Sequence, residues 1–110
     1  MLKFTSSTKY YLRSNPTDMR KGREALAGIV RAEMKHSPKS YDKAFIFYSK
    51  DYKKVKILHY DINGYVMYQK WFDNGRFLKP EFHKILSCHE ISREILILLL
   101  STAIQTKIAI

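Results

Sequence analysis

The spacing of turn segments between residues 44 and 78 constrains the fold of this chain more than any other feature. Runs rich in β-branched and aromatic residues alternate with short polar segments, and the pairs Asn63-Gly64 and Asn74-Gly75 tolerate the positive φ angles of tight turns. Strands joined by connections this short pair with their neighbours as hairpins. The sequence therefore predicts an antiparallel β-meander with strands at residues 44–49, 55–60, 65–72 and 76–78.

A helix is predicted over residues 17–35. Pro16 disfavours a helical conformation in the residue before it, Thr17 is a good capping residue, and the carboxylate of Asp18 complements the dipole of a first helical turn. A short strand at residues 10–12 precedes this helix. Apolar residues recur in it at helical spacing and form a stripe that we expect to pack on the sheet: Met19, Leu26, Ile29, Val30 and Met34.

A second helix is predicted over residues 88–106. Ser87 and Glu90 have the S-x-x-E spacing of a capping box just before an apolar run. Apolar residues cover most of the circumference of this helix, which indicates burial between the sheet and another surface, such as a partner chain. The length of 110 residues suits one domain. We therefore expect a single α+β domain over residues 1–110, with the meander packed against an N-terminal helix and a C-terminal apolar helix.

The positive charge of the chain is concentrated in its first half. Lys and Arg outnumber Asp and Glu by 20 to 10, and residues 1–60 alone carry a net charge of +9. An anionic partner would relieve the self-repulsion of such a surface, and a phosphate backbone is the natural candidate. An ordinary solvated, lysine-rich face is the alternative. The residues predicted to contact DNA phosphates are Arg13, Arg20, Lys21, Arg23, Lys50, Lys53, Lys54, Lys56 and Lys70.

Large side chains suggest two other kinds of surface. Trp71 and Phe72 follow a lysine at the end of the third strand, and Leu96 and Leu99 lie in the apolar C-terminal helix. In a protein-interaction alternative, these four residues would dock on a protein partner or on a second copy of the chain. In an RNA-binding alternative, unpaired bases would stack on Tyr48, Tyr52 and Tyr68.

The sequence contains no convincing set of catalytic or metal-binding residues. His83, Cys88 and His89 lie close together, but no fourth ligand follows at a familiar spacing. A metal-dependent nuclease would need two or three carboxylates that converge on metal ions. The available candidates include Asp61 and Asp73, but both lie in predicted turns, where Asp has an ordinary structural role. We therefore expect no metal, no cofactor and no enzymatic activity.

Cysteine content and hydropathy indicate where such a protein resides. A single cysteine excludes an internal disulfide, and the N-terminus has no apolar run that resembles a secretory signal. The longest apolar run, residues 95–100, has six residues, whereas a membrane span needs about 20. These features favour a cytoplasmic protein that does not enter a membrane.

Four segments occur in an order that resembles a known family. They are Pro-Thr-Asp-Met-Arg-Lys-Gly at residues 16–22, Phe-Ile-Phe at 45–47, Lys-Ile-Leu-His-Tyr-Asp at 56–61 and Gly-Tyr-Val-Met-Tyr-Gln-Lys at 64–70. On these segments the chain resembles TnpB, the small accessory proteins of bacterial insertion sequences of the IS sixty-six type. The family usually has Lys-Arg-Leu-Glu before a Gly-x-Phe, whereas this chain has Lys-Trp-Phe-Asp at residues 70–73, so one cation of the pattern is missing.

The resemblance implies participation in DNA transposition beside a separate, larger transposase that carries the catalytic carboxylates. We therefore expect a non-catalytic accessory protein that binds DNA through a basic surface and assists the transposase. The first alternative is an assembly module of the transposition complex that makes no direct contact with DNA. The second is RNA binding, and a homo-oligomer is compatible with each of these functions.

Overall fold

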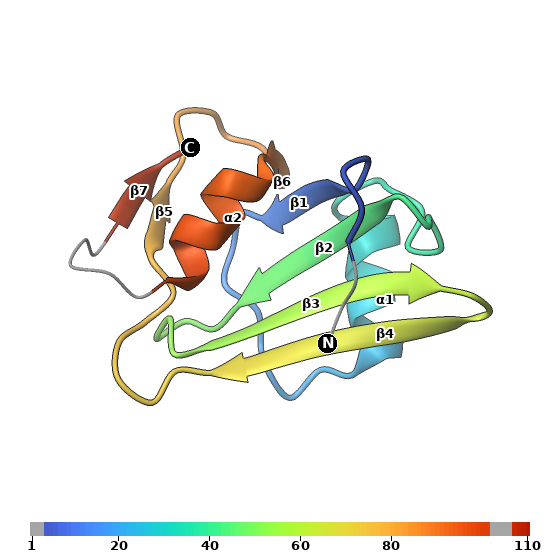
Figure 1. The fold of residues 1–110 in the computed structure, drawn as a ribbon, viewed down its shortest axis with the longest axis horizontal. Coiled ribbons are helices and arrows are strands. Elements are labelled where there is room, and N and C mark those ends of the chain that lie inside the picture. Colours follow the sequence, from blue (N-terminus) through green and yellow to red (C-terminus); the bar gives the residue numbers. More distant parts are fainter. Residues whose placement is uncertain (1–3, 102–106) are drawn as a thin grey trace.

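The computed structural model describes residues 4–101 and 107–110, and its centre is a five-stranded sheet (Figure 1). The strands are β1 (Lys9–Arg13), β2 (Lys43–Tyr48), β3 (Lys54–Asp61), β4 (Gly64–Trp71), β5 (Lys79–Glu81), β6 (Cys88–Ile91) and β7 (Lys107–Ala109). The large sheet has the order β4-β3-β2-β1-β6, with β1 parallel to β2 and the other neighbouring pairs antiparallel. Strands β5 and β7 form a small parallel sheet of their own.

Two helices pack on opposite faces of the large sheet (Figure 1). Helix α1 (Arg23–Ala32) connects β1 to β2, because parallel neighbours need a crossover rather than a hairpin. Helix α2 (Arg93–Leu100) follows β6 and packs on the other face, beside β5 and β7. The predicted α+β class is confirmed, with a sheet that is mostly antiparallel.

Each face of the sheet has its own hydrophobic core. Side chains alternate between the faces along a strand, and both faces of β2 are buried, with Phe45 and Phe47 toward α1 and Ile46 toward α2. The prediction that an apolar stripe of the first helix packs on the sheet is confirmed. Leu26, Val30 and Met34 are all buried in the core under α1. The core under α2 also contains Phe72, Phe77, Leu96 and Leu99.

The start of the first helix differs from the prediction. The N–H of Thr17 donates to the carbonyl of Tyr48 at the end of β2 (2.7 Å), so Thr17 is fixed to the sheet and caps no helix. The Asp18 carboxylate accepts the N–H of Arg20 (2.9 Å) and closes a local turn. The N-cap of α1 is Gly22, which offers no side chain for capping. Residues 17–22 are therefore an irregular segment rather than helix.

The second helix also starts later than predicted. Residues 88–91 form strand β6, which pairs antiparallel with β1, so the predicted capping box at Ser87 and Glu90 is wrong. The actual cap is Ser92, whose hydroxyl accepts the N–H of Ile95 (3.1 Å). Pairing with β1 determines the conformation of residues 88–91 in place of the local capping pattern, because these residues alternate in burial and complete the edge of the sheet. Residues 102–106 of the predicted helix lie outside the described residues.

The meander is confirmed for β2, β3 and β4, with two local corrections. The β3–β4 turn is centred one residue earlier than predicted, on Ile62 and Asn63, whose φ angles are 21° and 68°. The predicted fourth strand at residues 76–78 is wrong. Phe77 and Leu78 are buried against the α2 side of the sheet, and the N–H of Leu78 donates to the carbonyl of Leu99 (3.1 Å). This packing leads the chain away from the edge of β4.

Candidate nucleic-acid interface

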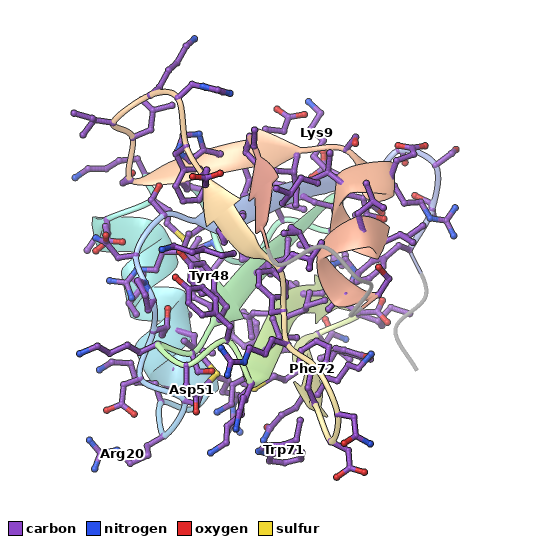
Figure 2. All side chains as sticks on the ribbon, turned by 90° about the vertical axis from the view of Figure 1, so that its left-hand side faces the viewer. Lys9, Arg20, Tyr48, Asp51, Trp71 and Phe72 are labelled. Carbon is purple, nitrogen blue, oxygen red and sulfur yellow. The ribbon has the colours of Figure 1, made fainter. Side chains whose placement is uncertain are left out.

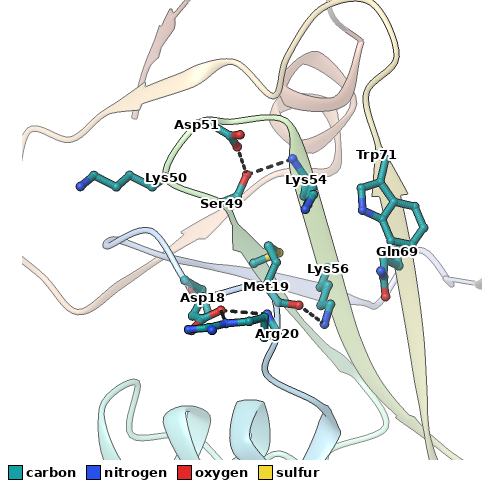
Figure 3. A pocket seen from close by; sticks show the side chains of 11 residues that line it. Asp18, Met19, Arg20, Ser49, Lys50, Asp51, Lys54, Lys56, Gln69 and Trp71 are labelled. Carbon is teal, nitrogen blue, oxygen red and sulfur yellow. Dashed lines mark hydrogen bonds and ion pairs between the residues drawn. The ribbon is translucent and has the colours of Figure 1, made fainter.

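One pocket collects several of the predicted phosphate contacts (Figure 3). Its volume is about 670 Å³, and three segments that are distant in sequence form it. They are the irregular segment at residues 17–20, the turn at residues 49–51, and the adjoining parts of β3 and β4. We call it the basic pocket, after a lining that includes Arg20, Lys50, Lys54 and Lys56, together with Gln69 and Trp71.

Two cross-strand pairs form one wall of the basic pocket. Lys54 lies opposite Trp71 in the β3–β4 register, and Lys56 lies opposite Gln69. These four side chains belong to the sheet face that α1 covers, because Leu58 has the same parity on β3 and lies in the core under that helix. Trp71 remains 60% exposed. The hairpin therefore presents an indole ring and an ammonium group side by side.

Lys56 has a different environment from the one predicted. From its position on one face of β3, the Lys56 ammonium is expected to be exposed to solvent. In the structure, the residue is only 6% exposed. Its Nζ donates to the carbonyls of Met19 (2.7 Å) and Lys21 (2.8 Å), and these bonds tie the irregular segment to the sheet. An ammonium group has three donors, and within the described residues two of them are used. One donor remains for an acceptor in the basic pocket.

Arg20 and Asp18 form an ion pair on another wall of the pocket. The guanidinium donates from Nη2 to Oδ2 of Asp18 (2.8 Å), and Nε donates to the same carboxylate. The hydrogen bonds from Arg20 hold the pKa of Asp18 well below its usual range. The Arg20 side chain is almost fully exposed, so its remaining N–H donors face solvent.

A hydrogen-bonded turn fixes the lysines that follow β2. The hydroxyl of Ser49 donates to the carboxylate of Asp51 (2.7 Å) and accepts the backbone N–H of Lys54 (3.0 Å). The Ser49 hydroxyl and the N–H of Lys53 lower the pKa of Asp51. Within the described residues, the ammonium groups of Lys50 and Lys54 make no hydrogen bond or ion pair. The basic pocket therefore has four cations against two carboxylates among its lining residues.

The other predicted phosphate contacts lie around the pocket or away from it. Lys21 and Lys53 are exposed next to pocket residues in the chain. Arg13 is largely buried and binds both carboxylate oxygens of Glu33, at 2.6 and 2.8 Å. Hydrogen bonding by Glu33 raises the pKa of Arg13, and the same contact lowers the pKa of Glu33. Arg13 is therefore engaged in an ion pair within the protein.

Two further predicted cations lie at other sites. Arg23 lines a second pocket with Lys39 and Tyr60, beside the β3–β4 turn. Lys70 belongs to the opposite sheet face, where its Nζ donates to the carbonyl of Leu100 (3.3 Å) and lies over the ring of Phe72. The cations of the first half of the chain are therefore divided among several sites. Figure 2 shows one such separation, with Lys9 near one end of the molecule and Arg20 and Trp71 near the other.

The residues predicted to form a protein interface have different positions. Phe72, Leu96 and Leu99 are buried in the core under α2, so they contribute to folding rather than to an accessible surface. Trp71 is exposed, but it lines the basic pocket. The exposed apolar residues of α2 are Ile97 and Leu98. Sequence periodicity alone could not separate these from their buried neighbours, because every position from 95 to 100 is apolar.

The predicted stacking tyrosines are covered to different degrees. Tyr48 is buried between the rings of Tyr52 and Phe77, with centroid distances of 5.6 and 5.4 Å, and its hydroxyl donates to the carbonyl of Ser14. Burial raises the pKa of Tyr48 far above its usual value. Tyr52 and Tyr68 are partly buried against the same core. None of these three rings lines the basic pocket, in which Trp71 is the aromatic residue.

The described residues provide neither a cluster of metal ligands nor a membrane-spanning helix. In that part of the chain, no group of three or more His, Cys, Asp or Glu side chains is arranged to hold a metal ion. None of the helices found there has the length and apolar character needed to cross a membrane.

Comparison with known proteins identifies the family. The family model described as IS66 Orf2 like protein matches residues 8–108. The uncharacterized protein y4jC of Sinorhizobium fredii is 27% identical over 67 residues, which are 61% of this chain and 56% of that protein. The match thus spans little more than half the length of this curated relative. No solved structure matches the chain. Because the family model covers nearly the whole sequence, the chain belongs to the IS66 Orf2-like family of insertion-sequence accessory proteins.

Proposed function

We propose that this protein is a non-catalytic accessory factor of DNA transposition that binds DNA through the basic pocket and the cations beside it. The observation that carries the proposal is the convergence of Arg20, Lys50 and Lys54 from three separate segments around one pocket. Lysine and arginine side chains are common donors to phosphate oxygens in protein–DNA complexes, and such contacts fix the position of the protein on the DNA. Family membership supplies the context of transposition.

The charges of the pocket suit a phosphate backbone better than an isolated ion. Lys50 and Lys54 carry charges without an internal partner in the described residues, and Lys21 and Lys53 are exposed nearby. Contacts of this kind bind every sequence similarly and release counterions. If three phosphates are neutralised, the logarithm of the affinity should fall with the logarithm of salt concentration with a slope of about −3.

Assistance to a separate transposase completes the proposal. The two carboxylates at the basic pocket are engaged in local hydrogen bonds, Asp18 with Arg20 and Asp51 with Ser49. Their lowered pKa values favour the ionised form and do not suit a general acid. We therefore assign strand cleavage and joining to the transposase, and DNA positioning to this chain.

Charge reversal at the pocket tests DNA binding. The double variant Lys50→Glu/Lys54→Glu should bind duplex DNA at least about tenfold more weakly and show a shallower salt dependence. Lys9→Glu/Lys84→Glu is the matched control, because it changes two exposed lysines elsewhere and lowers the net charge of +10 by the same amount. Equal losses in both variants, or no detectable binding by the unmodified protein, would contradict the proposal.

A second function has one observation in its favour. Ile97 and Leu98 expose 54% and 43% of their surface on α2, next to the buried Leu96 and Leu99. Adjacent exposed aliphatic side chains on one helix can form part of an apolar patch that contacts another protein. An assembly role for this face is compatible with DNA binding at the basic pocket, because the two involve opposite faces of the sheet.

A further inference from the structure

Trp71 is an unusual residue to find at the edge of a charged pocket. It is the single tryptophan of the chain, and 60% of it is exposed although indole rings are usually well buried. Its cross-strand partner is Lys54, and Lys56 and Arg20 line the same pocket, whereas the Lys50 side chain extends outward from its rim (Figure 3). Phosphate binding alone gives no reason for a large apolar ring at this position.

We propose that the basic pocket holds an unpaired nucleotide of DNA, with its base stacked on Trp71 and its flanking phosphates against Lys54, Lys50 and Arg20. The inference rests on the proposed function and specifies the form of DNA that the pocket takes. Proteins that bind single strands combine a cationic groove with aromatic rings on which bases stack. In a duplex, neighbouring base pairs cover the faces of each base, so an indole at the surface has no ring to stack on.

Polar groups in the pocket complement this arrangement. The amide of Gln69 offers both a donor and an acceptor to the edge of a base, and it lies on the same strand face as Trp71, two residues away. The remaining Nζ donor of Lys56 is available to a base carbonyl or a phosphate oxygen. The volume of about 670 Å³ lies within the range of roughly 300–1,000 Å³ for pockets that bind small ligands.

Rigid surroundings would lower the cost of ordering the pocket on binding. Lys56 anchors the irregular segment through two carbonyls, and Ser49 and Asp51 fix the turn on the other side. Trp71 is held on β4, a regular strand of the large sheet. A stacking ring on such a scaffold needs little rearrangement before a base reaches it.

The intrinsic fluorescence of Trp71 gives a direct test. The protein has no other tryptophan, so quenching reports on this ring alone. Titration with an oligothymidylate of about 12 nucleotides should quench the emission, and titration with a fully paired blunt duplex should leave it largely unchanged. A duplex that carries a single-stranded extension should quench as the oligothymidylate does. Equal emission with all three probes would overturn the inference.

Substitution separates stacking from charge. Trp71→Ala should weaken binding of the oligothymidylate by roughly 5- to 150-fold, while Trp71→Phe keeps a stacking ring and loses less. Tyr41→Ala is the matched control, because Tyr41 is 61% exposed and does not line the basic pocket. Circular dichroism confirms that each variant is folded.

The outcomes distinguish this inference from the proposed function. If duplex binding survives with its salt dependence but Trp71→Ala binds the oligothymidylate as the unmodified protein does, the nucleotide pocket is refuted and DNA binding stands. If neither probe binds, the proposed function itself fails. If oligouridylate quenches Trp71 and binds more tightly than oligothymidylate, the assignment to DNA is wrong and RNA is the ligand.

Discussion

The buried ammonium of Lys56 leads to a prediction about how the basic pocket is held together. Lys56→Met keeps a long apolar side chain but removes the donors that bind the carbonyls of Met19 and Lys21 at 2.7 and 2.8 Å. Hydrogen bonds with one charged partner contribute about 1.5–3 kcal/mol each, which gives a gross loss of about 3–6 kcal/mol for the two.

Two effects reduce this loss. Methionine carries no charge, so the cost of burying the ammonium disappears in the variant. Water can also hydrate the freed carbonyls, because Met19 is half-buried and Lys21 is exposed. We expect a net decrease of about 1–3 kcal/mol in the free energy of unfolding. For a domain of this size, that corresponds to a melting temperature lower by about 4–12 °C.

Thermal unfolding followed by circular dichroism measures the overall effect, and amide hydrogen exchange locates it. Exchange should accelerate most in residues 17–22, which lose their anchor on β3. Lys54→Met is the control on the same strand face, because Lys54 is exposed and its ammonium has no partner in the described residues. It should change stability by less than about 0.5 kcal/mol. If Lys56→Met is as stable as Lys54→Met and exchange at residues 17–22 is unchanged, the anchoring role is refuted.

Three other substitutions follow from the structure. Because the hydrogen bonds from Arg13 hold the pKa of Glu33 below its ordinary value of 4.5, the pair stabilises the fold fully above that pH and loses its effect as pH falls through the lowered value. Glu33→Gln should therefore destabilise the protein in urea at about pH 7 and much less at about pH 3, and a pH-independent loss would contradict this. Ile62→Asn should raise the unfolding free energy by about 0.5–1 kcal/mol, because a β-branched residue is strained at a φ of 21°; a loss of stability in urea would show that the turn tolerates isoleucine. Ile97→Glu/Leu98→Glu should leave the melting temperature nearly unchanged and abolish capture by the transposase, whereas Leu96→Asp should unfold the domain; undiminished capture would exclude this face of α2.

Local sequence patterns were enough to predict the elements that depend on neighbours in the chain. The meander from β2 to β4 follows from alternating runs and short turns, and the apolar stripe of α1 follows from helical spacing. The elements that depend on distant partners could not be predicted in this way. Residues 88–91 match a capping pattern, yet they pair with β1, which lies about eighty positions earlier in the chain.

The position of Trp71 shows what hairpin register can and cannot reveal. With Asp61 opposite Gly64, Lys54 lies opposite Trp71. Had the turn been centred on Asn63-Gly64, as predicted, the partner would have been Lys56. Either register places a lysine beside the indole on one sheet face, so this contact was within reach of the sequence. The exposure of the ring could not be predicted from the sequence, because it depends on where residues 17–20 and 49–51 cross the sheet.

Counting charges along the sequence overestimates the surface available to DNA. Arg13 and Lys56 belong to the most basic part of the chain, but one is committed to Glu33 and the other to two backbone carbonyls. Arg13 also donates from Nη1 to the hydroxyl of Thr17 (3.0 Å), so both cations hold the segment between β1 and α1, and this segment presents Arg20 to the pocket. Some of the cations therefore build the scaffold that positions the others. Their loss should weaken DNA binding by disordering the basic pocket, whereas loss of Lys50 or Lys54 should weaken it with no change in the fold.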